Sequence, residues 1–99
     1  MSNFEFPLEF PPSEMKIKAL IIDIELKKDK NQHDYWVIRT RLDKDTRRDY
    51  LAFGGDYQMA PKTLQILDNY PERLVNSWAV LTIKKNNDRE KVIAIESER

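Results

Sequence analysis

The chain has 99 residues, with 17 Lys and Arg, 17 Asp and Glu, a single His and no Cys. This length allows one compact domain, and the lack of Cys excludes a disulfide framework, a thiolate metal site and a cysteine nucleophile. Apolar runs are no longer than that at residues 19–22, so we expect no membrane span and no signal peptide. A soluble, cytoplasmic domain is the expected class.

Charge is balanced over the whole chain but not along it. Residues 1–15 contain three Glu and no Lys or Arg, which gives a net charge of −3. Residues 16–95 contain 16 Lys and Arg against 12 Asp and Glu, a net charge of +4, and residues 96–99 carry −1. A mildly basic body between two acidic ends permits an anionic partner. Charge scattered at random over a solvated surface is the alternative explanation.

Residues 1–15 predict an extended, acidic and aromatic arm that precedes a domain at residues 16–99. Apolar side chains alternate with polar ones or proline between Asn3 and Phe10. Pro7, Pro11 and Pro12 exclude a helix or a central strand in this segment.

Three strands are expected next, over residues 16–26, 35–42 and 47–53. In the first, Ile17, Ala19 and Ile21 lie on one parity, whereas apolar residues from position 20 to Leu26 lie on the other. A buried face that switches halfway indicates a bend, a bulge or a strand shared by two sheets. The third strand ends at Gly54-Gly55.

A helical period follows. Pro61 suits a first helical turn, and Leu64, Leu67 and Tyr70 recur at a spacing of three until Pro71 interrupts them. Two further strands are expected at residues 78–83 and 91–95, joined by a polar hairpin loop at residues 84–90.

This order of three strands, one helix and two strands predicts an all-β fold, a small five-stranded barrel with one capping helix. In element order and helix position, residues 16–96 resemble the oligonucleotide/oligosaccharide-binding (OB) fold. The helix start at residues 61–64 and the lead into the fourth strand at residues 74–80 are similar to small single-stranded DNA-binding proteins. Asn76-Ser77 stands where that family often has Gly. An SH3-type barrel is the nearest competitor, and a helix of about two turns or more favours the OB-like barrel.

The resemblance implies a ligand across strands two and three, between the loops at residues 27–34 and 84–90. The even positions of strand two, from Trp36 to Leu42, suit the interior, so the odd positions face outward. In strand three, Leu51 and Phe53 suit the core, which places Arg48, Tyr50 and Ala52 outside. Trp36 and Trp78 are both expected in the core. If the parity of strand two is reversed, Trp36 becomes the exposed ring instead of Tyr35.

Arginines interleaved with aromatic rings suit an unpaired nucleic acid, because bases stack on rings and guanidinium groups bind phosphates. The loop lysines, with Lys91 at their edge, would neutralise further phosphates. The predicted nucleic-acid-binding residues are Tyr35, Arg39, Arg41, Arg48, Tyr50, Lys27, Lys28, Lys30, Lys84, Lys85 and Arg89.

We therefore expect non-catalytic binding of single-stranded DNA with low sequence specificity, in replication, recombination or repair. RNA binding and a protein-interaction or oligomerisation role for the same face are the alternatives. No cofactor, metal or membrane partner is expected, and the carboxylate pairs at positions 23 and 25 and at positions 43 and 45 lack a third ligand for metal chemistry. The arm could compete for the groove, join two subunits into a homodimer or pack on its own barrel.

Overall fold

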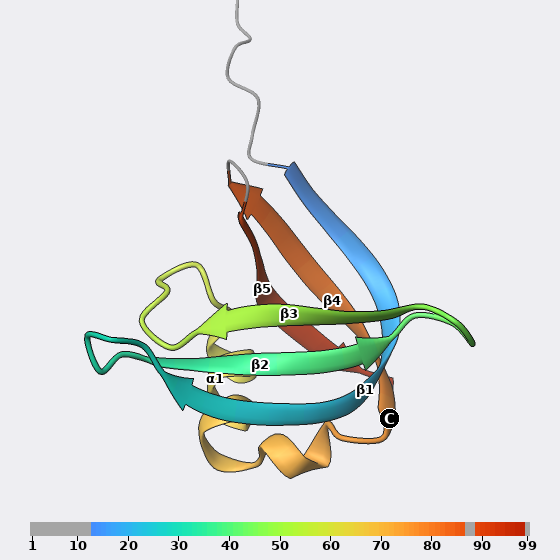
Figure 1. Cartoon of the computed structure of the whole chain (residues 1–99), viewed down its shortest axis with the longest axis horizontal. Coiled ribbons are helices and arrows are strands. Elements are labelled where there is room, and N and C mark those ends of the chain that lie inside the picture. Colours follow the sequence, from blue (N-terminus) through green and yellow to red (C-terminus); the bar gives the residue numbers. More distant parts are fainter. Residues whose placement is uncertain (1–12, 87–88, 99) are drawn as a thin grey trace, which may run out of the picture.

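The computed structural model describes residues 13–86 and 89–98 and places five strands in a closed barrel (Figure 1). The expected arm, apart from residues 13–15, lies outside the described residues. The elements follow the expected order, with the helix between the third and fourth strands. They are β1 (Ser13–Lys28), β2 (Asp34–Arg41), β3 (Arg47–Phe53), α1 (Pro61–Asn69), the 3-10 turn η2 (Pro71–Arg73), β4 (Ser77–Asn86) and β5 (Arg89–Ser97).

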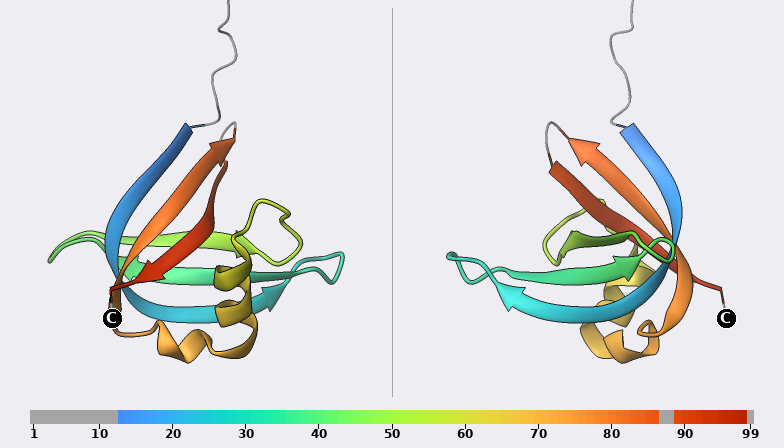
Figure 2. Two further views of the ribbon diagram at one scale, coloured as in Figure 1. Left: turned by 180° about the vertical axis from the view of Figure 1, so that it is seen from behind. Right: turned by 45° about the vertical axis from the view of Figure 1, so that its right-hand side comes forward.

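β1 is the element that closes the barrel. Its first half pairs with β4 and its second half pairs with β2, both antiparallel. A register shift between Ile21 and Asp23 separates the two halves, at the position where the apolar parity changes. Figure 2 shows β1 bending from one sheet partner to the other. The expected bend or bulge is confirmed, and β1 is shared between two neighbouring strands, β4 and β2, of one closed sheet.

The remaining pairs complete the order β1-β2-β3-β5-β4. β2 pairs with β3 and β4 pairs with β5, both antiparallel, whereas β3 meets β5 through one parallel pair, Leu51 with Lys91. This one parallel pair closes the ring of strands, so the seam between β3 and β5 is the most sparsely paired in the barrel.

The core fills the barrel with aliphatic side chains from every strand. Ile21, Ile38, Leu81 and Val92 are fully buried, and Leu67 brings α1 into the same cluster. Burying a side chain of this size contributes about 1.5–3 kcal/mol relative to leaving it exposed. The inward parity expected for strand two is confirmed.

α1 is fixed at both ends by backbone geometry and to β5 by hydrogen bonds. Pro61 occupies its first turn, and the helix ends at Asn69, two residues before Pro71. The Ala60 N–H donates to the Ile93 carbonyl at 2.7 Å, and the Ile95 N–H donates to the Thr63 hydroxyl at 3.0 Å. These bonds hold α1 against β5, behind β1 and β2 in the view of Figure 1.

Three expectations about the strands are wrong. β1 begins at Ser13, so residues 13–15 belong to the barrel and not to the arm. β4 continues to Asn86 and β5 begins at Arg89, so most of the expected loop at residues 84–90 is paired strand. Trp78 is 41 % exposed, because it shares the outward parity of β4 while Ser77 and Ala79 point inward.

Candidate nucleic-acid interface

The outer face of β2 and β3 is defined by their antiparallel register. Tyr35 lies opposite Phe53, Val37 opposite Leu51, Arg39 opposite Asp49 and Arg41 opposite Arg47. On the inner face, Trp36 lies opposite Ala52 and Ile38 opposite Tyr50. The predicted outward direction is therefore confirmed for Tyr35, Arg39 and Arg41.

The prediction for β3 is wrong by one residue. Tyr50 is buried, and Ala52 is completely buried, whereas Leu51 and Phe53 line the outer face. The physical reason is complementarity of size, because the small Ala52 leaves room for the large indole of Trp36. Arg48 shares the inward parity but is exposed at the end of the barrel, where its carbonyl accepts a hydrogen bond from the Thr40 hydroxyl at 2.8 Å.

Because the parity of β3 is opposite to the predicted one, its outer face carries a different aromatic ring and a different arginine from those expected. Phe53 takes the place expected for Tyr50, with its ring centroid 6.2 Å from that of Tyr35 and the planes tilted by 33°. Arg47 takes the place expected for Arg48. The outer face thus has two aromatic rings at one end and two arginines at the other.

A groove of about 930 Å³ runs over the aromatic end of this face. We call it the β2–β3 groove. Its walls come from the β1–β2 loop and from the β4–β5 hairpin, and α1 contributes none of the described lining residues. The lining comprises Asp29, Tyr35, Val37, Asp49, Tyr50, Leu51, Phe53, Lys85, Arg89 and Glu90.

Arg39 is held by carboxylates and is not free for a phosphate. It donates to Asp23 at 3.1 Å and to Glu25 at 2.9 Å, and Asp49 is its neighbour on β3. The hydrogen bond with Glu25 raises the pKa of Arg39 further above its ordinary range, and the charges of the nearby carboxylates act in the same direction. The predicted phosphate contact of Arg39 therefore has an internal competitor.

Arg41 and Arg47 face each other directly across β2 and β3. Within residues 13–86 and 89–98, neither guanidinium takes part in an ion pair with a carboxylate. Like charges opposite each other on a sheet are mutually repulsive and lower stability. A bound anion would relieve that repulsion.

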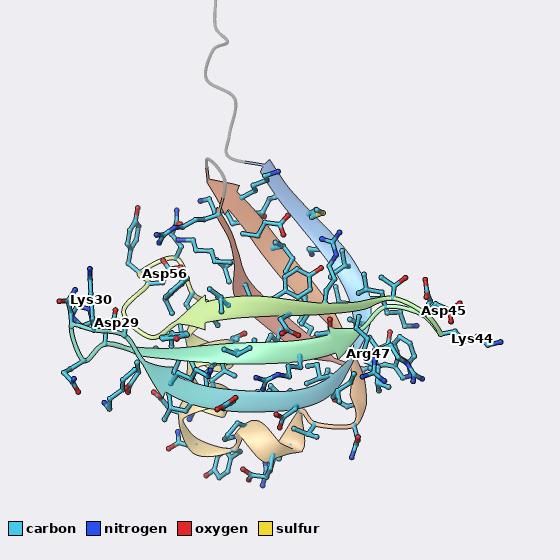
Figure 3. The ribbon with its side chains drawn as sticks, in the orientation of Figure 1. Asp29, Lys30, Lys44, Asp45, Arg47 and Asp56 are labelled. Carbon is cyan, nitrogen blue, oxygen red and sulfur yellow. The ribbon has the colours of Figure 1, made fainter. Side chains whose placement is uncertain are left out.

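The predicted lysines fall into two groups. Lys28 forms an ion pair with Asp34 at 2.8 Å, and Lys27 on β1 lies opposite Tyr35 on β2. Lys30 extends from the β1–β2 loop, which Figure 3 places with Asp29 at one end of the sheet. On the hairpin, Lys85 and Arg89 line the groove, whereas Lys84 lies between Glu14 and Lys91 in the barrel wall.

The β1–β2 loop is ordered by Asp29. Its carboxylate accepts hydrogen bonds from the backbone N–H groups of Asn31 at 2.8 Å and His33 at 2.9 Å. The bond from His33 is the main reason that the pKa of Asp29 lies below its ordinary value. The backbone N–H of Asp45, followed by the hydroxyl of Thr46, similarly lowers the pKa of Asp43 in the β2–β3 turn.

Sequence reasoning missed Phe53, Leu51 and Arg47 because both parities of β3 carry an arginine and an aromatic ring. The available signal was Ala52, which is the only residue of that strand small enough to face Trp36. His33 is exposed. No group of three His, Cys, Asp or Glu side chains suited to a metal ion occurs among the described residues.

Comparison with protein-family models, with curated proteins and with solved structures found no match. Within the described part of the chain, no helix is long and apolar enough to cross a membrane.

Proposed function

We propose that the outer face of β2 and β3 binds single-stranded nucleic acid, with DNA as the first choice and little sequence preference. The observation that carries the proposal is the pair Arg41–Arg47, which lacks a carboxylate partner in the described structure and lies on the same face as Tyr35 and Phe53. Phosphates bind guanidinium groups in a forked geometry, and unpaired bases stack on aromatic rings. The role is protection of exposed strands during replication, recombination or repair, in the cytoplasm.

The ligand path follows from the order of side chains along β2. Tyr35 and Arg41 are six residues apart on one strand, which corresponds to about 20 Å at the usual rise. A base stacked between the walls of the groove can thus be followed by phosphates that reach the arginine pair. Lys85 and Arg89 supply cations at the other end, and Arg39 in the middle is already neutralised.

Titration of a labelled oligothymidylate, followed by fluorescence anisotropy at two salt concentrations, tests the proposal. The double variant Arg41→Ala/Arg47→Ala should bind more weakly, and its salt dependence should be shallower by about 1.4 in the slope of log K against log salt, about 0.7 for each lost phosphate. The matched control is Lys62→Ala/Arg73→Ala, which removes the same charge from α1 and η2. Equal weakening in both double variants, or no binding at low salt, contradicts the proposal.

A protein segment is the second candidate ligand. The centre of the groove is apolar, with Val37 and Leu51, and its charged lining is mixed, with Asp29, Asp49 and Glu90 beside two cations. Such a surface accommodates an extended peptide with weak dependence on salt.

The anisotropy titration described above, repeated with an RNA oligonucleotide, distinguishes RNA from DNA as the ligand.

A further inference from the structure

The loop between β3 and α1, residues 54–60, presents the most exposed large hydrophobic side chain of the described structure. Tyr57 is 92 % exposed. Within residues 13–86 and 89–98, no hydrogen bond or ring contact of its side chain is recorded. Tyr70 differs, because it is 45 % exposed and the guanidinium of Arg73 lies 4.5 Å from its ring centroid.

The backbone on both sides of Tyr57 is fixed. The Asp56 N–H donates to the Phe53 carbonyl at 3.2 Å, and the Gln58 N–H donates to the Asp56 carboxylate at 2.9 Å. Met59 then enters the core, where it is only 5 % exposed. Because the backbone is already anchored, only the side-chain torsions of Tyr57 lose freedom when its exposed ring meets a ligand.

An ion pair ties this loop to the wall of the β2–β3 groove. The second oxygen of the Asp56 carboxylate lies 2.8 Å from the Lys91 ammonium, and both side chains are largely buried. Lys91 pairs with Leu51 across β3 and β5 and follows Glu90 in β5. Leu51 and Glu90 line the groove. Figure 3 places Asp56 at the same end of the sheet as Asp29 and Lys30, whereas Arg47 lies towards the other end.

We propose that Tyr57 is a third stacking ring for the single-stranded ligand, on the loop that follows Phe53. The inference rests on the proposed function and extends its site. The ligand class is an unpaired nucleotide, because an exposed phenol ring offers a π-face to any base. Lys91 is a positioning residue, which holds the loop through Asp56.

The test compares two oligonucleotides of equal length, an oligothymidylate and an abasic strand, in anisotropy titrations of the full chain. Tyr57→Ala should weaken binding of the oligothymidylate about 5-fold or more and leave binding of the abasic strand unchanged. Tyr57→Trp should bind the oligothymidylate at least as tightly as the wild type. Tyr70→Ala is the control and should change neither titration. Equal loss on both strands, or no loss on either, overturns the inference.

The positioning role is tested in the same titrations. Lys91→Met should weaken binding of the oligothymidylate in the wild-type background but have no further effect when Tyr57 is already Ala, because both changes act through one ring. Equal weakening in both backgrounds overturns the role of Lys91. If Lys91→Met does not fold, Asp56→Asn keeps the shape of the side chain and serves for the same comparison.

Failure of this inference is distinct from failure of the proposed function. If the wild type binds no oligonucleotide at low salt, the proposed function is wrong and the inference falls with it. If the wild type binds and Tyr35→Ala weakens binding while Tyr57→Ala does not, the groove stands and only the third ring is wrong.

Discussion

The guanidinium of Arg39 lies 2.9 Å from the carboxylate of Glu25, in the middle of the face proposed to bind phosphates. A second contact joins Arg39 to Asp23 at 3.1 Å. These are exposed ion pairs, which contribute little to stability. Their greater effect is electrostatic, since they place two negative charges where an anionic ligand would pass.

Removing those two charges should strengthen binding of nucleic acid. The double variant Asp23→Asn/Glu25→Gln frees Arg39 and raises the charge of the face by two, so the affinity for an oligothymidylate should rise. The salt slope should steepen by about 0.7 for each additional phosphate held. Asp68→Asn/Glu72→Gln, which changes the charge equally on α1 and η2, is the control for net charge. If Asp23→Asn/Glu25→Gln leaves the affinity unchanged or lowers it while the control does not, the result would argue for a peptide ligand.

The apolar pattern of the sequence was sufficient to predict the barrel and the outward residues of β2. β1 was predictable because its buried parity changes at a single point, and a closed barrel requires such a bend. The helix was predictable because apolar residues recur every three to four positions between Pro61 and Pro71. In each case one buried face dominates the pattern.

The errors occur where two faces are similarly apolar or where burial depends on the neighbouring strand. On β3, Leu51 and Phe53 are more apolar than Tyr50 and Ala52, so composition favours the wrong face, and pairing with Trp36 decides the outcome. Trp78 is large and apolar but sits where β4 begins. Tyr57 has no periodic signal at all, because its exposure is set by hydrogen bonds within a loop.

The assignment of Ala52 to the interior predicts a large effect of its substitution. Ala52→Leu should destabilise the barrel by about 1–3 kcal/mol, because the added atoms meet the buried indole of Trp36. Leu51→Met, on the outer face, should change the free energy of unfolding by less than about 1.5 kcal/mol. Urea denaturation measures both. A neutral Ala52→Leu would mean that β3 has the opposite parity.

Acidification should loosen the β1–β2 loop only at low pH. The pKa of Asp29 is lowered below its ordinary value of 3.8, chiefly by the hydrogen bond from His33. A lowered folded-state pKa means that the stabilisation is present above pH 3.8 and is lost as the pH falls through the folded-state value. The amide proton shifts of Asn31 and His33 should therefore titrate together, with a midpoint below 3.8.

Asp29→Asn is the control for this titration, because the variant has no carboxyl group at that position. The two amide shifts should then stop titrating in the same range. A midpoint at or above 3.8 in the wild type would contradict the hydrogen-bonded arrangement of the loop.

The acidic arm can be tested by removing residues 1–12, which keeps all of β1. Ser13, the first residue after this segment, pairs with Lys85, and Lys85 lines the β2–β3 groove. Twelve extended residues reach about 40 Å at most, which is enough to cross the groove. The rings and carboxylates between Phe4 and Phe10 match the rings and cations of that site.

If the arm competes with the ligand, the truncated chain should bind the oligothymidylate more tightly, and a synthetic peptide of residues 1–12 should reverse the gain. A variant with Glu5→Gln and Glu9→Gln should show part of that gain, because it removes the charge and keeps the rings. If the arm instead joins two subunits, truncation should lower the mass measured by light scattering. No change in affinity or mass would show that the arm acts in neither way.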